Sequence, residues 1–236
     1  DTVFLQDVPV PVWKRGYEKC TIQNGNGAQE ELTISALGMS AGTTPKGVTS
    51  EVVEVKSFEE LLALGRNKVE GRIVFFNRPV DNRIINTFSG YGGAVDQRVS
   101  GASEASKLGA LAVVVRSATQ FIDDYPHTGV TRFGAGVNAI PAVAISTKDA
   151  ETLSIRLKER SSVKMTLIST CRILPDTVSY NVVAELNGSE KPGEFITVGG
   201  HLDSWDITQG AHDDAGGCVQ AIECIRLFKK LGIRPK

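Results

Sequence analysis

The spacing of apolar and polar residues along the chain predicts short strands that alternate with helices. Apolar residues at every second position, or in short unbroken runs, predict strands at 32–36, 51–55, 69–77, 113–115, 140–146 and 163–167. Spacings of three and four residues predict helices at 57–64, 105–112 and 149–158. The first of these helices begins with Ser57 and Glu60, which have the spacing of a capping box. Strands and helices in this order are typical of an α/β fold.

Two long polar or glycine-rich segments, 77–101 and 117–138, separate these elements and are predicted to be loops. Loops of this length inside a compact domain are uncommon and are usually functional or mobile. Gly90, Gly92 and Gly93 in the first segment do not form a phosphate-binding loop, because the lysine and the Ser or Thr of that motif are missing. A flexible loop is the better interpretation.

The last part of the chain is predicted to contain two strands and a helix. YNVVAEL (180–186) and FITVGG (195–200) have the composition of strands and are joined by a turn, and the second is expected to be buried on both faces. The helix covers 215–232, with apolar residues at intervals of three and four that form a stripe to bury. Gly232 fits a left-handed cap at its end.

Composition and charge exclude several classes of function. The chain has 236 residues, 41% of them hydrophobic, and a formal net charge of −1, which is typical of a globular protein with a sizeable core. It has no basic block, so we expect no nucleic-acid partner, and no apolar run approaches the roughly 20 residues that cross a bilayer, so we expect no membrane span. The four cysteines form no CxxC motif. Cys218 and Cys224 are expected to be buried thiols in the last helix, whereas a bridge between Cys20 and Cys171 stays open.

The loop GGHLDSWDITQGAHDDAGG (199–217) carries the candidate chemistry, because it follows a predicted strand at the end where α/β sheets bind ligands. The imidazole of His201 and the carboxylates of Asp203 and Asp213 are donors that suit zinc. A carboxylate beside the histidine can hold the imidazole in its ligating tautomer, and Asp213 can bridge two ions. Taken alone, His201 and Asp203 are equally explained as a hydrogen-bonded loop pair.

The same loop resembles the metal-binding segment of the di-zinc exopeptidases, a family that includes bacterial aminopeptidases and glutamate carboxypeptidases. The segments LPDTVSYNVVAELNGS, LGALAVVVRS, YPHTG and VPVPVWKRG extend the resemblance over most of the chain, and they are most similar to the plasma glutamate carboxypeptidase branch. The resemblance implies a partial zinc-exopeptidase α/β domain, made of residues 1–40 and 172–236. An inserted α/β domain of the protease-associated type is implied at 41–171.

The resemblance also implies roles for individual residues. His201 matches a ligand of one zinc ion, Asp213 matches the aspartate that bridges two zinc ions, and Asp203 matches a catalytic residue that supports the histidine. The implied substrate is a short peptide. The Glu-Glu pair and the later ligands of the family have no counterpart before Lys236, so the chain as written is expected to be an amino-terminal fragment that is catalytically incomplete.

Two classes of function stay open at this point. The first is a zinc exopeptidase that hydrolyses dipeptides or short peptides with metal-activated water, and the second is a non-catalytic protein-binding or lid module built on the inserted domain. The resemblance implies a secreted, periplasmic or lysosomal location, and it leaves open a homodimer and the choice between aminopeptidase and carboxypeptidase action. His127 of YPHTG is either an ordinary loop residue or a substrate contact. His212 departs from the family pattern.

Overall fold

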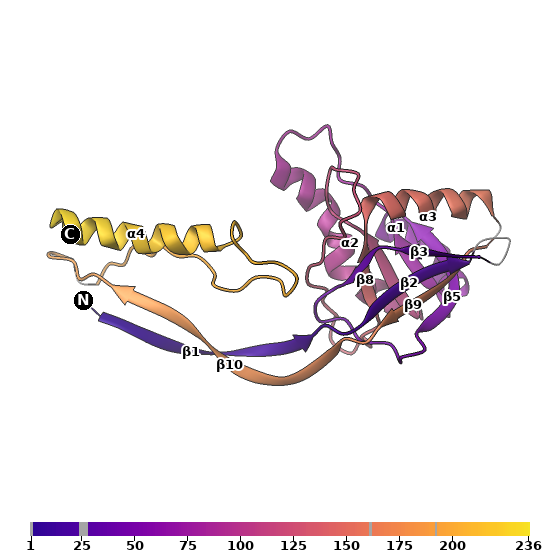
Figure 1. Ribbon diagram of the computed structural model, residues 1–236, viewed down its shortest axis with the longest axis horizontal. Coiled ribbons are helices and arrows are strands. Elements are labelled where there is room, and N and C mark those ends of the chain that lie inside the picture. Colours follow the sequence, from indigo (N-terminus) through magenta and orange to yellow (C-terminus); the bar gives the residue numbers. More distant parts are fainter. Residues whose placement is uncertain (1, 24–27, 161, 192) are drawn as a thin grey trace. The chain divides into compact units, whose positions relative to one another are not determined.

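The computed structural model describes residues 2–23, 28–160, 162–191 and 193–236, which fall into two compact units (Figure 1). The terminal unit consists of Asp1–Val12 and Pro175–Lys236, and the inserted unit consists of Trp13–Leu174. The chain therefore leaves the terminal unit, builds the whole inserted unit, and then returns.

The inserted unit contains, within the described residues, an eight-stranded mixed sheet in the order β3-β2-β9-β5-β6-β7-β8-β4. The strands are β2 (Glu18–Gln23), β3 (Gln29–Leu32), β4 (Ile34–Ala36), β5 (Val48–Val55), β6 (Ile73–Phe76), β7 (Ala112–Arg116), β8 (Ala142–Ile145) and β9 (Lys164–Ser169). Strands β5 to β8 are parallel neighbours, and the remaining pairings are antiparallel. Every residue of β6, β7 and β8 is buried, as expected for parallel strands covered on both faces.

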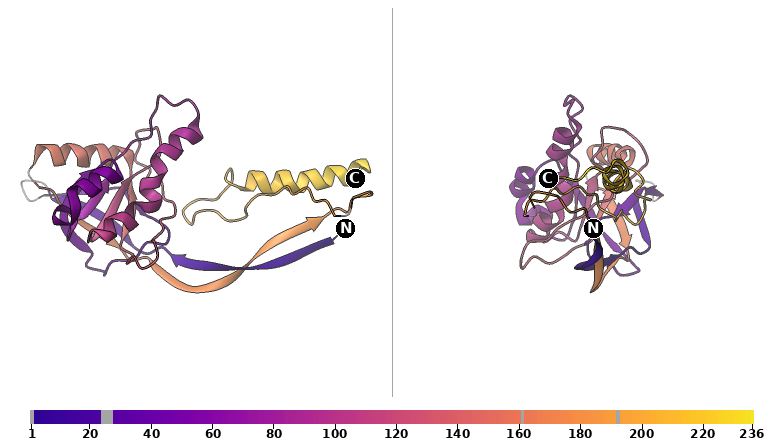
Figure 2. Two further views of the ribbon diagram at one scale, coloured as in Figure 1. Left: turned by 180° about the vertical axis from the view of Figure 1, so that it is seen from behind. Right: turned by 90° about the vertical axis from the view of Figure 1, so that its left-hand side faces the viewer.

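Three helices cover the two faces of this sheet: α1 (Phe58–Val69), α2 (Thr87–Lys107) and α3 (Thr147–Glu159). Ala150 and Leu153 of α3 pack into the core on one face, and residues of α1 and α2 pack into the core on the other, so the helices sandwich the sheet (Figures 1 and 2). The start of α1 at Ser57 is confirmed, because the Glu60 amide donates to the Ser57 hydroxyl at 3.2 Å. The reciprocal bond of the capping box is shifted by one residue, since the Glu60 carboxylate accepts from the Lys56 amide at 2.7 Å.

The prediction of a loop over 77–101 is wrong in its second half, since α2 already begins at Thr87. Asn86 caps this helix by accepting a hydrogen bond from the Ser89 amide at 2.9 Å. Glycines lower helix propensity, but at Gly101 the missing side chain lets α2 lie against the sheet, because a Cβ there would be 2.9 Å from the Phe76 ring. Packing against the sheet thus overrides local propensity. The other predicted loop, 117–138, contains no helix or strand in the structure.

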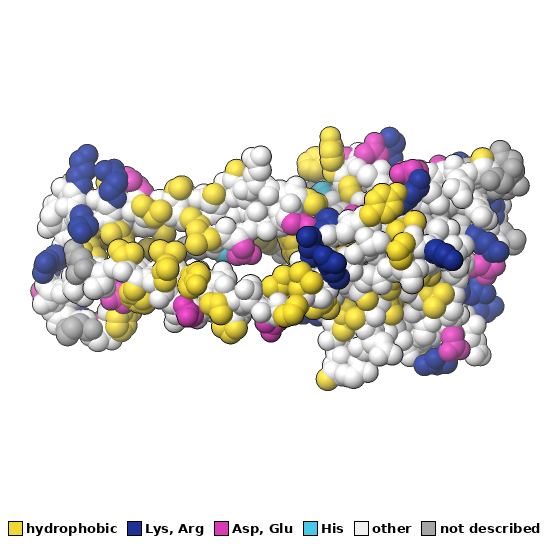
Figure 3. Space-filling model, turned by 60° about the horizontal axis from the view of Figure 1, so that its bottom comes forward, with side chains coloured by type: hydrophobic (Ala, Val, Ile, Leu, Met, Phe, Trp, Pro, Cys, Tyr) yellow, Lys and Arg dark blue, Asp and Glu magenta, His cyan; other side chains and the backbone are white. Residues whose placement is uncertain are grey.

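The described residues of the terminal unit form most of the strands β1 (Thr2–Lys14) and β10 (Arg172–Glu185), whose inner ends reach into the inserted unit, and the helix α4 (Ala215–Leu231). The two strands pair with each other and run in opposite directions (Figure 1). The prediction of helix α4 is confirmed, including its left-handed cap at Gly232, where φ is 64°. The expected burial of its apolar stripe is wrong: Ile222 is 68% exposed, and apolar side chains lie at the surface along both β10 and α4 (Figure 3).

The strand predicted at 195–200 is not formed, and Phe195 and Ile196 are 81% and 90% exposed. A strand needs a neighbour that accepts and donates its backbone hydrogen bonds, and none of the described strands pairs with this segment. Its apolar residues therefore have neither a ladder nor a core. None of the helices that the structure describes is both long and apolar enough to cross a bilayer.

Two further expectations need correction. The expected boundary between residues 40 and 41 is displaced, because β2, β3 and β4 belong to the sheet of the inserted unit and the division falls after Val12. The boundary expected at 171 lies close to the observed one, after Leu174. Cys218 is half-buried and Cys224 is exposed, so neither is a buried thiol, while Cys20 and Cys171 are buried and unbridged.

Candidate metal-binding site

The segment between residues 200 and 215 doubles back so that its two ends meet. Asp214 caps α4 by accepting a hydrogen bond from the Gly217 amide at 3.0 Å. Within the loop, the Thr208 amide donates to the Trp205 carbonyl at 2.9 Å, and the Ala215 amide donates to the Gly210 carbonyl at 2.9 Å. These local bonds bring His201 back to the residues that precede the helix.

The imidazole of His201 lies between two acceptors. Its Nε2 is 2.9 Å from Oδ1 of Asp213, and its Nδ1 is 2.9 Å from the backbone carbonyl oxygen of Asp203. The Asp203 carboxylate is further away, with Oδ1 at 3.5 Å from Nδ1. About half of the His201 side chain (53%) is exposed, so both solvent and ions have access to this group.

The protonation of this histidine follows from its neighbours. A neutral imidazole carries one N–H, and Nδ1 donates it to the Asp203 carbonyl, which leaves the Nε2 lone pair facing the Asp213 carboxylate. In that neutral form the lone pair of Nε2 and the carboxylate repel each other unless a metal ion lies between them, whereas the imidazolium form donates a hydrogen bond to each acceptor. The Asp203 carbonyl, followed by the Asp213 and Asp203 carboxylates, accordingly raises the pKa of His201 against the opposing effect of desolvation.

The main chain of His201 is fixed by the first turn of α4. The His201 amide donates to Oδ2 of Asp214 at 3.1 Å, and the Cys218 thiol donates to the His201 carbonyl at 3.3 Å. Gly200 makes this close approach feasible, because a Cβ at that position would lie 2.6 Å from the Cys218 amide nitrogen. The peptide bond between Asp213 and Asp214 is cis.

The structure brings together the three residues that the sequence singled out, although Asp203 faces the imidazole with its carbonyl more closely than with its carboxylate. His212 is exposed. Among the residues that the structure describes, no group of three or more His, Cys, Asp or Glu side chains converges to hold a metal ion. The described residues therefore offer a metal ion two donors, Nε2 of His201 and the carboxylate of Asp213. Asp214 was not assigned a role from the sequence, although an aspartate directly before the first residue of a helix is a recognisable cap signal.

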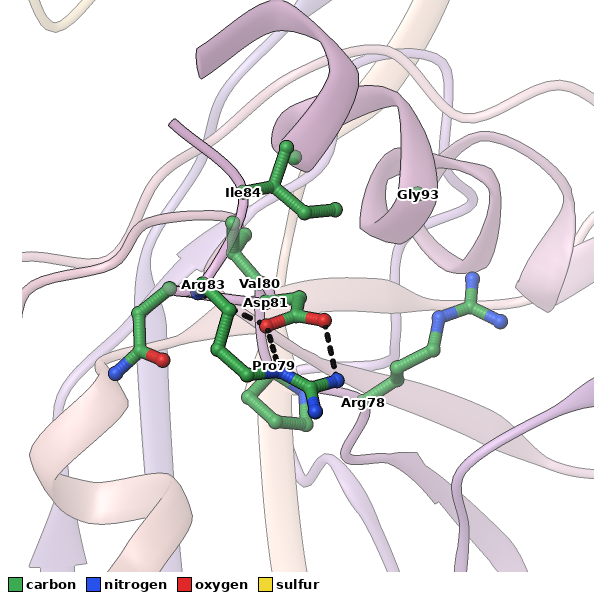
Figure 4. Close-up of a pocket in the computed structure, with 9 residues that line it drawn as sticks. Arg78, Pro79, Val80, Asp81, Arg83, Ile84 and Gly93 are labelled. Carbon is green, nitrogen blue, oxygen red and sulfur yellow. Dashed lines mark hydrogen bonds and ion pairs between the residues drawn. The ribbon is translucent and has the colours of Figure 1, made fainter. Parts of the chain in front are cut away.

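A separate cavity of about 480 Å³ lies in the inserted unit, beside the start of α2 (Figure 4). Figure 4 shows the Asp81 carboxylate facing the Arg83 guanidinium, which binds it through Nε at 2.9 Å and Nη2 at 2.7 Å. These hydrogen bonds lower the pKa of Asp81 to about 2. The other lining arginine, Arg78, pairs with Asp96. Since carboxylates neutralise both arginines, these side chains give the cavity no excess positive charge that would attract an anion.

The chain is similar in fold to solved structures of peptidases. The chain is similar to a Peptidase M28 precursor from Shewanella amazonensis SB2B, with a TM-score of 0.84 and 35% identity over 91% of this chain and 48% of the other. Its fold is also that of a zinc aminopeptidase from Bacillus subtilis, with a TM-score of 0.54 and 18% identity over 91% of this chain and 44% of the other. The chain therefore has the fold of part of an α/β peptidase.

The sequence comparisons point to peptidases as well. Residues 181–236 match the profile described as Peptidase family M28, and these residues include the whole loop that carries His201 and Asp213. The chain is 40% identical over its full length to carboxypeptidase Q of Bos taurus. It spans about half the length of the curated relatives it matches, 48% in this case. The match to Peptidase family M28 thus covers residues 181–236, which carry the candidate site.

Proposed function

We propose that this chain supplies the first zinc ligands of an exopeptidase, and that these ligands are Nε2 of His201 and the carboxylate of Asp213. The observation that carries the proposal is their mutual approach to 2.9 Å, with the opposite ring nitrogen engaged by a carbonyl. At this distance the two groups are linked by a proton on Nε2 when the ring is an imidazolium, and a metal ion can take the place of that proton. Membership of the loop in an M28 peptidase segment supports zinc as the ion.

The donors fit zinc in type and in spacing. Zinc takes imidazole nitrogen and carboxylate oxygen at about 2.0 Å, and neighbouring ligands of a tetrahedral ion are then about 3.3 Å apart. The observed 2.9 Å needs only a small adjustment to reach that value. Because the structure contributes two donors, we infer that the other ligands come from outside residues 1–236, which agrees with relatives about twice as long.

The proposed roles of the protein groups follow from their contacts. Bound zinc would supply a Lewis acid and a water molecule of lowered pKa for hydrolysis of the peptide bond. The Asp203 carbonyl holds the proton on Nδ1 and so keeps Nε2 free to bind metal, while the carboxylate of Asp203 lies near enough to support the ring. Asp213 has a second carboxylate oxygen that can bridge to another zinc ion. A centre with two ions stays a prediction.

We infer that the inserted unit is the domain of the protease-associated type that the sequence resembles. Its support is topological, because the chain enters this unit after Val12 and leaves it before Pro175, with the terminal unit on both sides in sequence. Short peptides as substrates, a secreted, periplasmic or lysosomal location, and a homodimer stay predictions.

The alternative function, a non-catalytic binding module, is favoured by one observation. Apolar side chains of the inserted unit are strongly exposed near the start of α2 and in the loop that follows β7, with Ile85, Phe88 and Phe121 as the clearest cases. Exposed apolar groups of this kind are common at protein-binding surfaces. This alternative predicts no dependence of function on zinc.

Zinc binding tests the proposal directly. Zinc titration by calorimetry should show a site that His201→Ala and Asp213→Ala each remove, because either change leaves a single donor. His212→Ala is the matched control, since this histidine is exposed and lies next to Asp213 in sequence. In the longer protein, dipeptide hydrolysis should stop on chelation and return with zinc. Zinc binding unchanged in both donor variants would refute the assignment.

A further inference from the structure

The carboxylate of Asp214 makes two hydrogen bonds that serve different parts of the molecule. Oδ1 accepts from the Gly217 amide at 3.0 Å, which caps helix α4. Oδ2 accepts from the His201 amide at 3.1 Å, which ties the preceding loop to the same helix. Capping a helix requires only one acceptor, and Ser, Thr or Asn provides it. The second oxygen is therefore available for another contact, and it binds the main chain of His201.

The contact reaches the residue whose side chain carries the candidate chemistry. The imidazole of His201 contacts the Asp213 carboxylate, and the backbone amide of His201 donates to the Asp214 carboxylate. Two adjacent aspartates therefore bind the side chain and the main chain of the same histidine. The thiol of Cys218, in the first turn of the helix, donates to the carbonyl of His201. A shift of the His201 main chain away from α4 must therefore break its bond with Asp214, and such a shift would carry the imidazole with it.

We propose that Asp214 is a positioning residue, which locks His201 to the start of α4 and thereby sets the spacing between the imidazole and Asp213. The inference rests on the proposed zinc-binding function. Only Asp and Glu carry two acceptor oxygens at the end of the side chain, and Glu is longer by one methylene. Asn would turn an N–H donor toward the His201 amide, and Ser would have no second acceptor.

The test separates capping from positioning. Asp214→Ser and Asp214→Asn keep a good helix cap, so thermal unfolding should stay near that of the parent chain. Both remove the acceptor of the His201 amide, so zinc affinity should fall about 10- to 100-fold, the range typical of residues that orient metal ligands. Asn86→Ala is the matched control, because it removes the cap of α2 in the inserted unit and should lower stability without changing zinc affinity.

A second measurement tests the contact without zinc. Amide hydrogen exchange at His201 should become faster in Asp214→Ser and Asp214→Asn, and should be unchanged in Asn86→Ala. Zinc affinity that falls with His201→Ala but not with the two Asp214 variants overturns the positioning role alone. Zinc affinity that does not depend on His201 overturns the proposed function and the positioning role together. Unchanged exchange at His201 in both Asp214 variants overturns the hydrogen bond itself.

Discussion

Replacement of Gly200 by alanine tests how closely the loop must approach helix α4. A Cβ at this position would lie 2.6 Å from the Cys218 amide nitrogen and 2.7 Å from Oδ2 of Asp214. Ordinary van der Waals contact begins at 3.4 Å, so the loop and the helix would have to separate by about 0.8 Å at the nearest atom. Gly199 is the matched control, because a Cβ there meets no atom within 4 Å.

The size of the effect differs between stability and zinc binding. The segment around Gly200 is exposed and has no regular structure, so it can shift instead of storing strain. We therefore expect the lower end of the 1–3 kcal/mol typical of overpacking, about 1 kcal/mol, reduced further by the smaller entropy of an unfolded chain that carries alanine. The shift moves His201, the next residue, and a metal site tolerates only about 0.5 Å of displacement. Zinc affinity should fall at least about 10-fold.

The assay compares the two variants with the parent chain. Zinc titration and thermal unfolding of Gly199→Ala should both match the parent within error. Gly200→Ala should lose zinc affinity while its unfolding temperature changes by a few degrees at most. Equal zinc affinity in the two variants would show that the approach of the loop to α4 does not set the ligand spacing, and the reasoning on Gly200 would be refuted.

Three further predictions concern protonation, thiol access and packing. Zinc affinity should fall as the pH is lowered, because protons compete with zinc for His201 below its pKa. The nearby carbonyl and carboxylates raise the pKa of His201, so this loss of affinity should begin at a higher pH than for an ordinary histidine. Zinc affinity that calorimetry finds unchanged between about pH 5 and 8 would contradict this prediction. Burial raises the pKa of the Cys20 thiol, so a thiol reagent should modify the exposed Cys224 in the native chain and Cys20 only after unfolding, as mass spectrometry can show. Gly101→Ala should lower the free energy of unfolding by about 1–3 kcal/mol, because the new Cβ would lie 2.9 Å from an aromatic ring. Gly92→Ala should instead stabilise α2 by up to about 1 kcal/mol, because a Cβ there meets nothing within 4 Å. Urea unfolding that ranks the two variants in the opposite order would refute the packing argument.

Local patterns predicted much of the inserted unit. The strands that are buried on both faces appear in the sequence as unbroken apolar runs, and the helices α1 and α3 appear as periodic segments, the first of them with a cap at its start. These signals are local, because each depends on neighbours within a few residues. The glycine-rich helix α2 could not be predicted in this way, since its place against the sheet depends on the close approach of Gly101 to Phe76, which is distant in sequence.

The candidate site shows the same division between local and tertiary information. By itself, the sequence determined which donors are present, because His201, Asp203 and Asp213 are residue types that bind or support zinc in a recognisable spacing. The tertiary structure decided that Asp203 offers its carbonyl to the imidazole and that Asp214 binds the His201 amide. It also left the segment at 195–200 without a strand partner. The reason is physical: residue type fixes which bonds a group can form, but only the folded chain fixes which partner comes within reach.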